Sequence, residues 1–328
     1  MTAASYEEIL RYRKKHIRLA STDHFMLNLL HDEILKQVVG LAISISIKRD
    51  GPPPCPFSFF VMGSAGRFEQ SVWSDQDHGI VYFEKNEQAM TYFLGLGKEI
   101  SDGLYQTGYN YCDGGVMSNN PLWCKSLYEW QQQLTDWIHE SSWESVRQLL
   151  IFIDSRTLYG EEIYIKQLKS FVYQFAQKAH LLKKMLNNTM FRKKGIGVLG
   201  QFLTETHGLH AGTLNIKETA LFPIVNSVRL MAIKGSIVSS STLTRLSQLP
   251  ERWIPAYKKQ LYQSHLLSLL DFRLKHGNHI NYDNGHYLPM DTLSKEEKIK
   301  MKEIIKTGSA LHRYVKEVIE KEENNGDE

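Results

Sequence analysis

The chain has 328 residues, 42% of them hydrophobic and 23% charged, which is ordinary for a globular protein with room for two domains. Its formal net charge of +3 is too small to indicate nucleic-acid binding, which usually requires basic residues gathered on one face. No apolar run approaches the length of a membrane span, and Cys55, Cys112 and Cys124 form no CxxC pair. We therefore expect a reduced, cytoplasmic protein that is not bound to a membrane.

Residues 1–50 are predicted to form an N-terminal helical segment, with helix over 5–48. Apolar residues recur there at steps of three and four: Leu27, Leu30, Ile34, Val38 and Leu41. The run DGPPPCP from Asp50 ends any helix, because proline removes a backbone donor and restricts the residue before it.

Two short strands and a helix are predicted next. FSFFVM and HGIVYF read as buried strands on either side of a polar turn from Gly63 to Ser74. The helix follows over NEQAMTYFLGLGKEISDGLYQ, and YNYCD is a candidate third strand. A small mixed sheet is therefore expected.

Helices dominate the rest of the sequence. Capping boxes at Ser126 with Glu129 and at Ser141 with Glu144 predict two helix starts, the second helix ending near Gly160. Further helices are predicted around 162–186, 218–234, 253–275 and 294–321, the last beginning with a capping box at Ser294. The fold class is therefore α+β. A small mixed-sheet core over 51–160 lies between the N-terminal helical segment and a C-terminal helical bundle over 161–328.

The stretch from Val61 to Phe83, VMGSAGRFEQSVWSDQDHGIVYF, is the strongest candidate for a functional site. Asp75 and Asp77 are separated by one residue before a strand, so their side chains point to the same side and Gln76 points to the other. Two adjacent carboxylates repel, and a divalent cation between them relieves that repulsion. Oxygen ligands favour Mg²⁺ or Mn²⁺.

The turn before these aspartates has the composition of a phosphate cradle. Gly63 and Gly66 allow backbone amides to approach a phosphate, Ser64 adds a hydroxyl donor, and Arg67 offers a planar cationic fork. Alone, a D-x-D or a Gly-Ser pair is common in solvated turns. The order strand, Gly-Ser, Arg, D-x-D, strand is more specific and predicts a site for a nucleoside triphosphate and its metal.

At these residues the sequence resembles the nucleotidyltransferase superfamily. GSAGRFEQSVWSDQDHGIVY is similar to the nucleotidyltransferase domain family related to bacterial PII-protein uridylyltransferases. Further blocks carry the resemblance along most of the chain: CDGGVMSNNPLW, FIDSRTLYGEE, LNIKETALFPIVNSVRLMAI and FRLKH. The last two resemble the helical, substrate-binding-type domain that accompanies the catalytic one.

The resemblance implies a signal-transduction enzyme that moves a nucleoside monophosphate, UMP or AMP, from a nucleoside triphosphate to a hydroxyl of a protein or small molecule. Pyrophosphate is released. By position, Gly63 and Ser64 would hold the triphosphate, and Asp75 and Asp77 the metal. Arg67 and Glu69 belong to a Gly-Arg-x-Glu element, expected to bind phosphate and support the loop. The cyclic-nucleotide-binding or CBS modules that often precede this domain are not matched.

The superfamily uses a third carboxylate, and the sequence leaves its identity open. Asp113 stands at the expected place, after the helix. Asp154 is the alternative, although pairing with Arg156 would give it a structural role. Without a third acid, the chain would be a catalytically weak or inactive nucleotide-binding module. The small antitoxin-type nucleotidyltransferases fit less well, because they lack a long helical domain.

Three other patterns have structural interpretations. His276, His279 and His286 are a conceivable metal site, but a polar loop between helices is the favoured interpretation. The basic segment FRKKG, near Lys183 and Lys184, is expected to be solvated. Tryptophans recur every seven residues and are expected to face the core: Trp123, Trp130 and Trp137.

Overall fold

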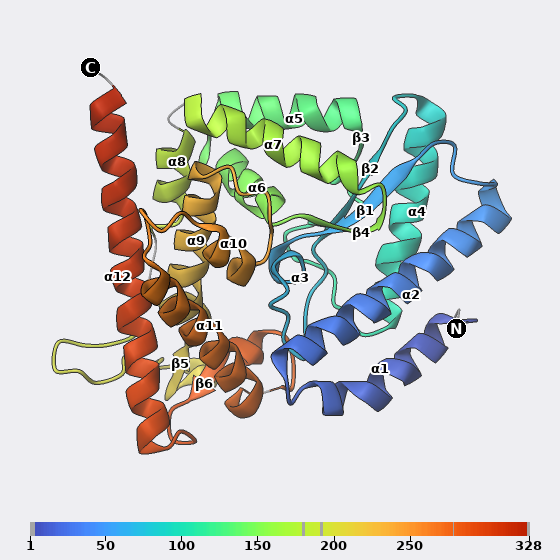
Figure 1. The fold of residues 1–328 in the computed structure, drawn as a ribbon. Helices are drawn as coiled ribbons and strands as arrows, with labels where there is room; N and C mark the ends of the chain where they lie inside the picture. Colours follow the sequence, from blue (N-terminus) through green and yellow to red (C-terminus); the bar gives the residue numbers. More distant parts are fainter. Residues whose placement is uncertain (1–3, 179–180, 191–192, 278, 327–328) are drawn as a thin grey trace. The chain divides into compact units, whose positions relative to one another are not determined.

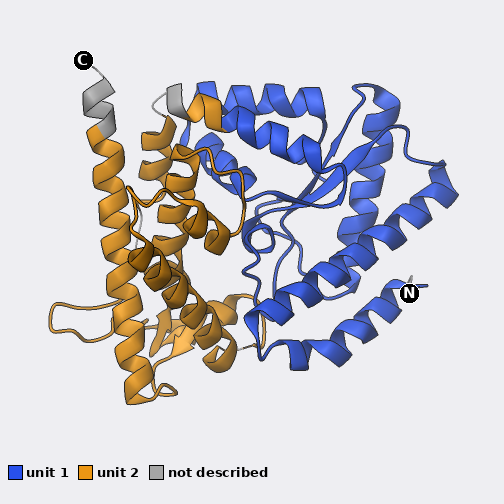
Figure 2. Cartoon of the chain, viewed as in Figure 1, with its two compact units in different colours: residues 1–172 blue, residues 173–328 orange. Residues whose placement is uncertain are grey.

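The computed structural model describes residues 4–178, 181–190, 193–277 and 279–326, which divide into two compact units (Figure 2). The first unit is Met1–Val172 and the second is Tyr173–Glu328. The boundary falls within helix α7 (Glu162–Lys178), so the N-terminal helices belong to the same unit as the main sheet.

The first unit is a four-stranded sheet covered by helices (Figure 1). The strands are β1 (Phe57–Val61), β2 (His78–Tyr82), β3 (Cys124–Ser126) and β4 (Arg156–Gly160). The helices before α7 are α1 (Tyr6–Ala20), α2 (His24–Asp50), α3 (Gly63–Arg67), α4 (Glu87–Gln106), α5 (Leu127–Glu140) and α6 (Trp143–Ile153). The strand order is β3-β2-β1-β4, with β1 antiparallel to both neighbours and β2 parallel to β3. The mixed sheet confirms the predicted α+β class.

Helices cover both faces of this sheet. On one face, Phe57 and Phe59 of β1 belong to a core shared with α2 and α4, and the ring of Phe57 lies 5.0 Å from that of Phe93. On the other face, the Phe60 ring lies 5.7 Å from Trp130 of α5. Alternate residues of a strand point to opposite faces, so burial on both sides explains why all of β1 is apolar except Ser58. The two strands predicted around the polar turn are thus confirmed.

The predicted tryptophan stripe is also confirmed. Trp123, Trp130 and Trp137 are all buried, and their rings lie 5.8 to 6.4 Å apart. The indole Nε1 of Trp130 donates to the carbonyl of Ile80 at 3.0 Å, which ties α5 to the middle of β2. These rings therefore fill the core and offer no platform for stacking bases.

The helical prediction for residues 5–48 is confirmed with one interruption, and the prediction of a third strand at YNYCD is wrong. The helix predicted over 5–48 is interrupted between α1 and α2, where the side chain of Asp23 caps α2 by accepting from the amide of Met26 at 2.7 Å. YNYCD forms an isolated bridge between Asn110 and Asp75, and the third strand is instead β3. Local aromatic content favoured a strand at YNYCD, but its neighbours in the fold allow a bridge there.

The region around α6 needs two corrections. The capping box at Ser126 is present, but α6 is capped by Ser142 and not by Ser141, which ends α5 with a φ of 48°. The helix predicted to continue to Gly160 ends at Ile153, and the following residues form β4. β4 pairs with β1, so the open edge of the sheet decides its conformation where local sequence does not.

The second unit is mostly helical. Its elements are α8 (Leu181–Asn188), a π-helix (Lys217–Leu221), α9 (Phe222–Lys234), α10 (Thr242–Gln248), α11 (Ala256–His276), α12 (Lys295–Gly326), β5 (Thr213–Asn215) and β6 (Tyr287–Pro289), with short 3₁₀ turns at Gly208–His210 and Asp283–His286. α9 lies at the centre of the bundle and packs against α8, α10 and α12 (Figure 1). The predicted capping box is present, because the amide of Glu297 donates to Ser294 Oγ and the amide of Ser294 donates to Glu297.

This bundle also contains a two-stranded sheet and a helix that were not predicted. β5 and β6 form an antiparallel ladder of three residues each, which is too short to show a period of two in the sequence. The other missed element is α10.

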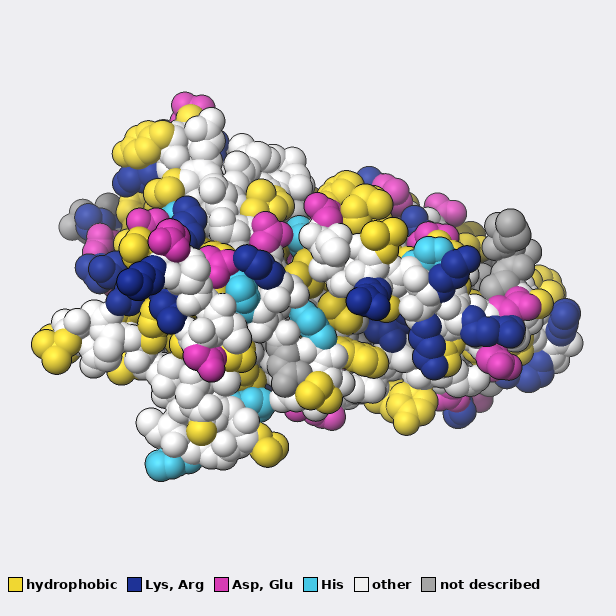
Figure 3. Space-filling view, turned by 90° about the horizontal axis from the view of Figure 1, so that it is seen from below, with side chains coloured by type: hydrophobic (Ala, Val, Ile, Leu, Met, Phe, Trp, Pro, Cys, Tyr) yellow, Lys and Arg dark blue, Asp and Glu magenta, His cyan; other side chains and the backbone are white. Residues whose placement is uncertain are grey.

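Two surface properties complete the description. Over the described residues, no helix combines the length and apolar character needed to cross a membrane. Acidic and basic side chains are interspersed on the face drawn in Figure 3, as the small net charge leads us to expect.

Candidate functional site

The bend after β1 lies directly against Asp77. Gly63 has a φ of +53°, and a Cβ atom there would lie 2.1 Å from Asp77 Oδ2, so only glycine fits without movement. The amide of Met62 donates to the carbonyl of Asp77 at 2.8 Å, which continues the β1–β2 pairing into the bend. The Gly-Ser turn and the second aspartate of the D-x-D pattern are therefore adjacent.

Asp75, Asp77 and Cys112 form a group of three ligand-type side chains. One ligand atom from each lies within 4.8 Å of the other two, and all three residues are partly buried. Cys112 Sγ donates to Asp77 Oδ1 at 3.4 Å. Asp75 is placed by its bridge to Asn110, whose carbonyl accepts from the amide of Gln76 at 3.0 Å. Within the described chain, this is the group found with metal-ligand spacing.

Gln76 points away from this group, as predicted, and fixes the strand between the two aspartates. Its Nε2 donates to the carbonyls of Ser101 and Tyr109 at 3.1 and 3.0 Å. Its Oε1 lies 2.9 Å from His78 Nε2, while His78 Nδ1 accepts from the amide of Ser118. Burial lowers the pKa of His78 to about 3, so the imidazole is neutral and donates from Nε2.

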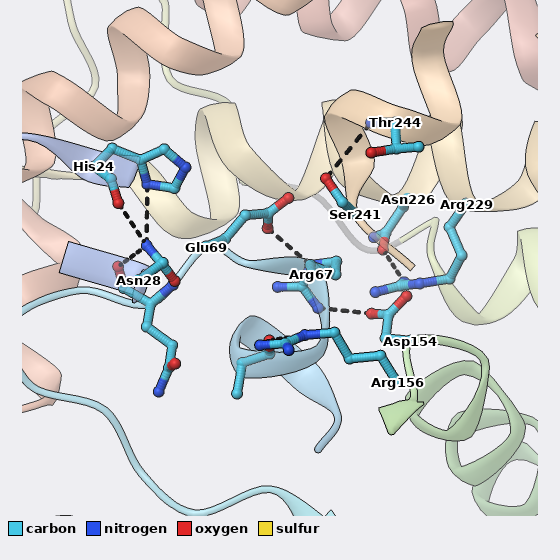
Figure 4. A network of polar contacts seen from close by, with 12 residues as sticks. His24, Asn28, Arg67, Glu69, Asp154, Arg156, Asn226, Arg229, Ser241 and Thr244 are labelled. Atoms are coloured by element: carbon cyan, nitrogen blue, oxygen red, sulfur yellow. Dashed lines mark hydrogen bonds and ion pairs between the residues drawn. The ribbon is translucent and has the colours of Figure 1, made fainter. Parts of the chain in front are cut away.

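Helix α2 holds the loop that leads to Asp75. The amide of Gln70 donates to Asn28 Oδ1 at 2.8 Å, and His31 Nε2 contacts the carbonyl of Ser71 at 2.9 Å (Figure 4 shows Asn28). From α1, Arg13 Nη2 donates to the carbonyl of Val72 at 3.0 Å. Buried polar side chains of the N-terminal helices thus bond to the backbone of this loop, a role that the apolar periodicity of residues 5–48 did not reveal.

The charge in the group depends on protonation of Cys112. Burial, followed by the negative charges of Asp77 and Asp75, raises the pKa of the Cys112 thiol to about 12. The thiol is therefore neutral and donates to Asp77. Two carboxylates and no thiolate make a hard, oxygen-rich donor set, which suits Mg²⁺ or Mn²⁺ better than a soft metal.

Asp113, the predicted third carboxylate, is exposed and does not belong to the group. Its neighbour Cys112 takes the position beside Asp77. Sequence reasoning missed Cys112 because a thiol is not expected beside hard-metal ligands. The available signal was its place at the start of the CDGGVM block, one residue from the predicted acid.

Arg67 lies in a buried ion triad (Figure 4). Its Nε donates to Glu69 Oε2 and its Nη1 to Asp154 Oδ2, both at 2.7 Å. Burial alone would lower the pKa of Arg67, but the two carboxylates outweigh that effect and raise it. Arg67 therefore supports the loop by joining it to the end of α6.

The expected pair between Asp154 and Arg156 is wrong. Asp154 pairs with Arg67, whereas Arg156 Nη1 donates to Asp32 Oδ2 at 2.9 Å and Arg156 Nη2 donates to the carbonyl of Ala65 at 2.9 Å (Figure 4). Arg156, the first residue of β4, therefore joins α2 to the middle of α3.

The three histidines of the second unit have separate partners. His276 Nε2 lies 3.0 Å from Glu297 Oε1, and His279 Nε2 contacts the carbonyl of Leu274 at 2.8 Å. His286 Nε2 lies 3.4 Å from Lys217 Nζ. These separate contacts agree with the favoured interpretation, a polar loop. In the basic segment, residues 191 and 192 lie outside the described residues, and Lys193 donates to Glu205.

Two family models match the chain. One, described as "Putative nucleotidyltransferase DUF294", matches residues 9–144. The other, described as "Putative nucleotidyltransferase substrate binding domain", matches residues 179–319. Together they cover most of the sequence, and each falls entirely within one compact unit. A comparison with curated proteins finds no significant match.

Proposed function

Because the chain belongs to the family described as "Putative nucleotidyltransferase DUF294" and carries that family's C-terminal domain, we propose that it catalyses metal-dependent transfer of a nucleoside monophosphate. The donor is a nucleoside triphosphate, UTP or ATP, and the acceptor is a hydroxyl of a protein or small molecule. The observation that supports this most directly is the convergence of Asp75 and Asp77 beside Gly63.

In this proposal Asp75 and Asp77 hold Mg²⁺ or Mn²⁺, which when bound would offset negative charge on the triphosphate. The acceptor hydroxyl attacks the α-phosphorus, a new P–O bond forms, and the bond to pyrophosphate breaks. Gly63 lets the turn lie against Asp77, Gly66 lets α3 pack against the backbone of Asp154, and Ser64 supplies a hydroxyl for the phosphates. The Arg67 triad and α2 keep the loop in place, so the reacting groups are positioned before substrate binds.

The contacts of Cys112 bear on how the acceptor proton is removed. A carboxylate is a suitable base, but the side chain beside Asp77 is a protonated thiol that donates a hydrogen bond. Asp154 is engaged by Arg67, and Asp113 is exposed. We therefore assign no third acid, and we propose that the proton leaves to solvent or to one of the paired aspartates.

The same observation favours a second candidate function, a nucleotide-binding module that does not transfer. Such a module would keep the turn and the aspartate pair but lack an effective base. The two functions differ in one measurable property: only the enzyme releases pyrophosphate in a reaction that consumes the bound nucleotide.

The test compares wild type with Asp75→Asn/Asp77→Asn. The full chain is incubated with Mg²⁺ or Mn²⁺, α-labelled UTP or ATP, and cell lysate as the source of acceptor. Loss of both charges should reduce labelling and pyrophosphate release by about 1,000-fold, since charge stabilisation worth several kcal/mol is removed. Asp136→Asn, at an exposed position of α5, is the matched control.

Each outcome assigns a function. Labelling that the double variant loses and the control keeps supports transfer. Binding of nucleotide by calorimetry without pyrophosphate release supports the module. Equal labelling by wild type and the double variant would exclude Asp75 and Asp77 as the catalytic pair.

A further inference from the structure

Helix α1 carries a buried arginine, Arg13, whose side chain contacts two loop segments of the first unit. Arg13 is 5% exposed, and its Nη2 donates to the carbonyl of Val72 at 3.0 Å. Its guanidinium carbon lies 5.1 Å from the centre of the Trp73 ring and 4.8 Å from the centre of the Tyr109 ring, within the range of cation–π contacts. One side chain therefore joins two segments that are distant in the sequence.

These two segments carry members of the candidate metal group. Trp73 stands two residues before Asp75. Tyr109 stands three residues before Cys112 and directly before Asn110. The segments meet at the bridge between Asp75 and Asn110. A cation in contact with both rings therefore limits how far the two sides of this bridge can move apart.

Stability alone does not explain an arginine at this position. Within the described chain, Arg13 makes no ion pair with a carboxylate, and its Nε has no hydrogen-bond partner. Burying a guanidinium without a matching anion costs free energy that an apolar side chain of similar length would not cost. The segment after α4 nevertheless approaches it closely, since Gly108 has a φ of +93° and a Cβ atom there would lie 2.3 Å from Arg13 Nη1. The directed contacts of the guanidinium are therefore what this side chain contributes.

Helix α1 is itself fixed against α2 and α4. Ile9 is fully buried, and the hydroxyl of Tyr6 donates to Glu99 Oε1 at 2.9 Å. A Cβ atom on Gly103 of α4 would lie 2.5 Å from the Tyr6 ring, so the two helices approach closely. Arg13 follows Ile9 by four residues and lies on the same face of α1. The docked helix thus determines where the guanidinium lies.

We propose that Arg13 is a positioning residue. It holds the segments of Asp75 and Cys112 against each other, so the docked helix α1 sets the affinity of the aspartate pair for a divalent cation. Ligands that are held in place before the ion arrives lose less conformational entropy on binding it. The inference rests on the proposed function, because it takes Asp75 and Asp77 as the metal ligands.

The amide of Gln76 reports this positioning without any metal, because it donates to the carbonyl of Asn110 across the bridge. In EDTA, Arg13→Met should raise its hydrogen-exchange rate, measured by NMR, at least tenfold, since methionine fills the space but cannot donate to Val72. The amide of Ile80, in the middle of β2, is the reference for global unfolding and should change less. Arg11→Met removes the same charge from an exposed position of α1 and should leave both rates unchanged.

The second readout is the affinity for Mn²⁺, measured by calorimetry on the full chain. Arg13→Met should weaken Mn²⁺ binding at least tenfold. Arg13→Lys should recover part of that loss, because an ammonium can still donate to the carbonyl of Val72. Leu134→Ala is the control for lost stability: Leu134 is fully buried in α5, on the other face of the sheet, and its variant should bind Mn²⁺ as wild type does.

Two results would overturn the proposal: Mn²⁺ binding by Arg13→Met equal to that of wild type, or Gln76 exchange that rises no more than exchange at Ile80. Failure of the proposed function gives different results. A wild type that binds Mn²⁺ but releases no pyrophosphate excludes transfer, while loss of Mn²⁺ affinity in Arg13→Met still supports positioning. A wild type that binds no Mn²⁺ contradicts the metal site, and it overturns the role of Arg13 in metal affinity as well.

Discussion

Each unit holds a neutral titratable side chain beside two like charges. In the first unit Asp75 and Asp77 converge beside a neutral thiol, and in the second unit Lys217 and Arg273 converge beside a neutral imidazole. Both neutral groups are kept uncharged by burial and by the charges next to them. The comparison teaches that burial and like charges together decide protonation: two carboxylates keep the thiol protonated, and two cations keep the imidazole deprotonated.

The largest effect is expected at Arg67, whose charge is matched by the buried carboxylates of Glu69 and Asp154. Arg67→Gln should lower the free energy of unfolding by about 3 kcal/mol, since Glu69 and Asp154 would remain buried without their partner. Urea unfolding measures the change. Arg147→Gln is the control: Arg147 is about half exposed beside Glu144, and its loss should cost less than about 1 kcal/mol. Equal costs would mean that the triad contributes nothing beyond a surface pair.

The aspartate pair of the first unit should make stability depend on a divalent cation. At about 100 times its dissociation constant, Mg²⁺ should stabilise the chain by about 2.7 kcal/mol. The Mg²⁺ effect should disappear in Asp75→Asn/Asp77→Asn and persist in Lys217→Gln, which changes the second unit. Unfolding curves with and without Mg²⁺ measure this. An equal Mg²⁺ effect in wild type and in the double aspartate variant would contradict a metal site at this pair.

The histidines His78 and His286 are both neutral, one in each unit, and this predicts a pH dependence. Because the pKa of His78 is lowered to about 3, the unfolded chain takes up a proton near pH 6.5 that the folded chain does not. Its contribution to stability is complete above that pH and is lost as the pH falls toward 3. Between about pH 7.5 and about pH 5, wild type should lose about 2 kcal/mol more than His78→Gln. Parallel pH profiles in urea unfolding would show that His78 is protonated in the folded chain.

The smallest expected effects come from two glycines of the first unit. Gly63→Ala should destabilise the chain by about 1 kcal/mol and reduce nucleotide or Mg²⁺ affinity, because the new methyl group meets Asp77 and φ is positive. Gly40→Ala should instead stabilise it by about 0.5–1 kcal/mol, since Gly40 lies inside α2 with nothing within 4 Å of its Cβ position. Thermal unfolding and calorimetry measure both. If both substitutions changed the free energy of unfolding in the same direction, close packing of Gly63 against Asp77 would be contradicted.

The sequence predicted those parts of the fold whose signals are local. The strands around the Gly-Ser turn, the α+β class and the capping boxes at Ser126 and Ser294 depend on neighbouring residues, and the structure has them. β4 and the β5–β6 hairpin were missed because strand pairing with distant residues defines them.

In the candidate site, too, the features with local signals were predicted and those made by distant contacts were not. The positions of Asp75 and Gln76 on opposite sides follow from the period of a strand, and the structure agrees with it. The contact of Cys112 with Asp77 and the pairing of Arg67 with Asp154 join segments that are far apart in the chain. No pattern within the 61–83 stretch carries that information, since the contacts exist only after the sheet and its helices have packed.

The antiparallel pairing of β1 with β2 has a consequence for folding. Gly63 and Asp77 belong to one hairpin, so the contact between them closes a short loop and costs little chain entropy. The bend and its carboxylate can therefore meet early in folding, before the remote strand β4 arrives to complete the sheet. Two residues of the candidate site therefore lie in a part of the chain whose pairing is local.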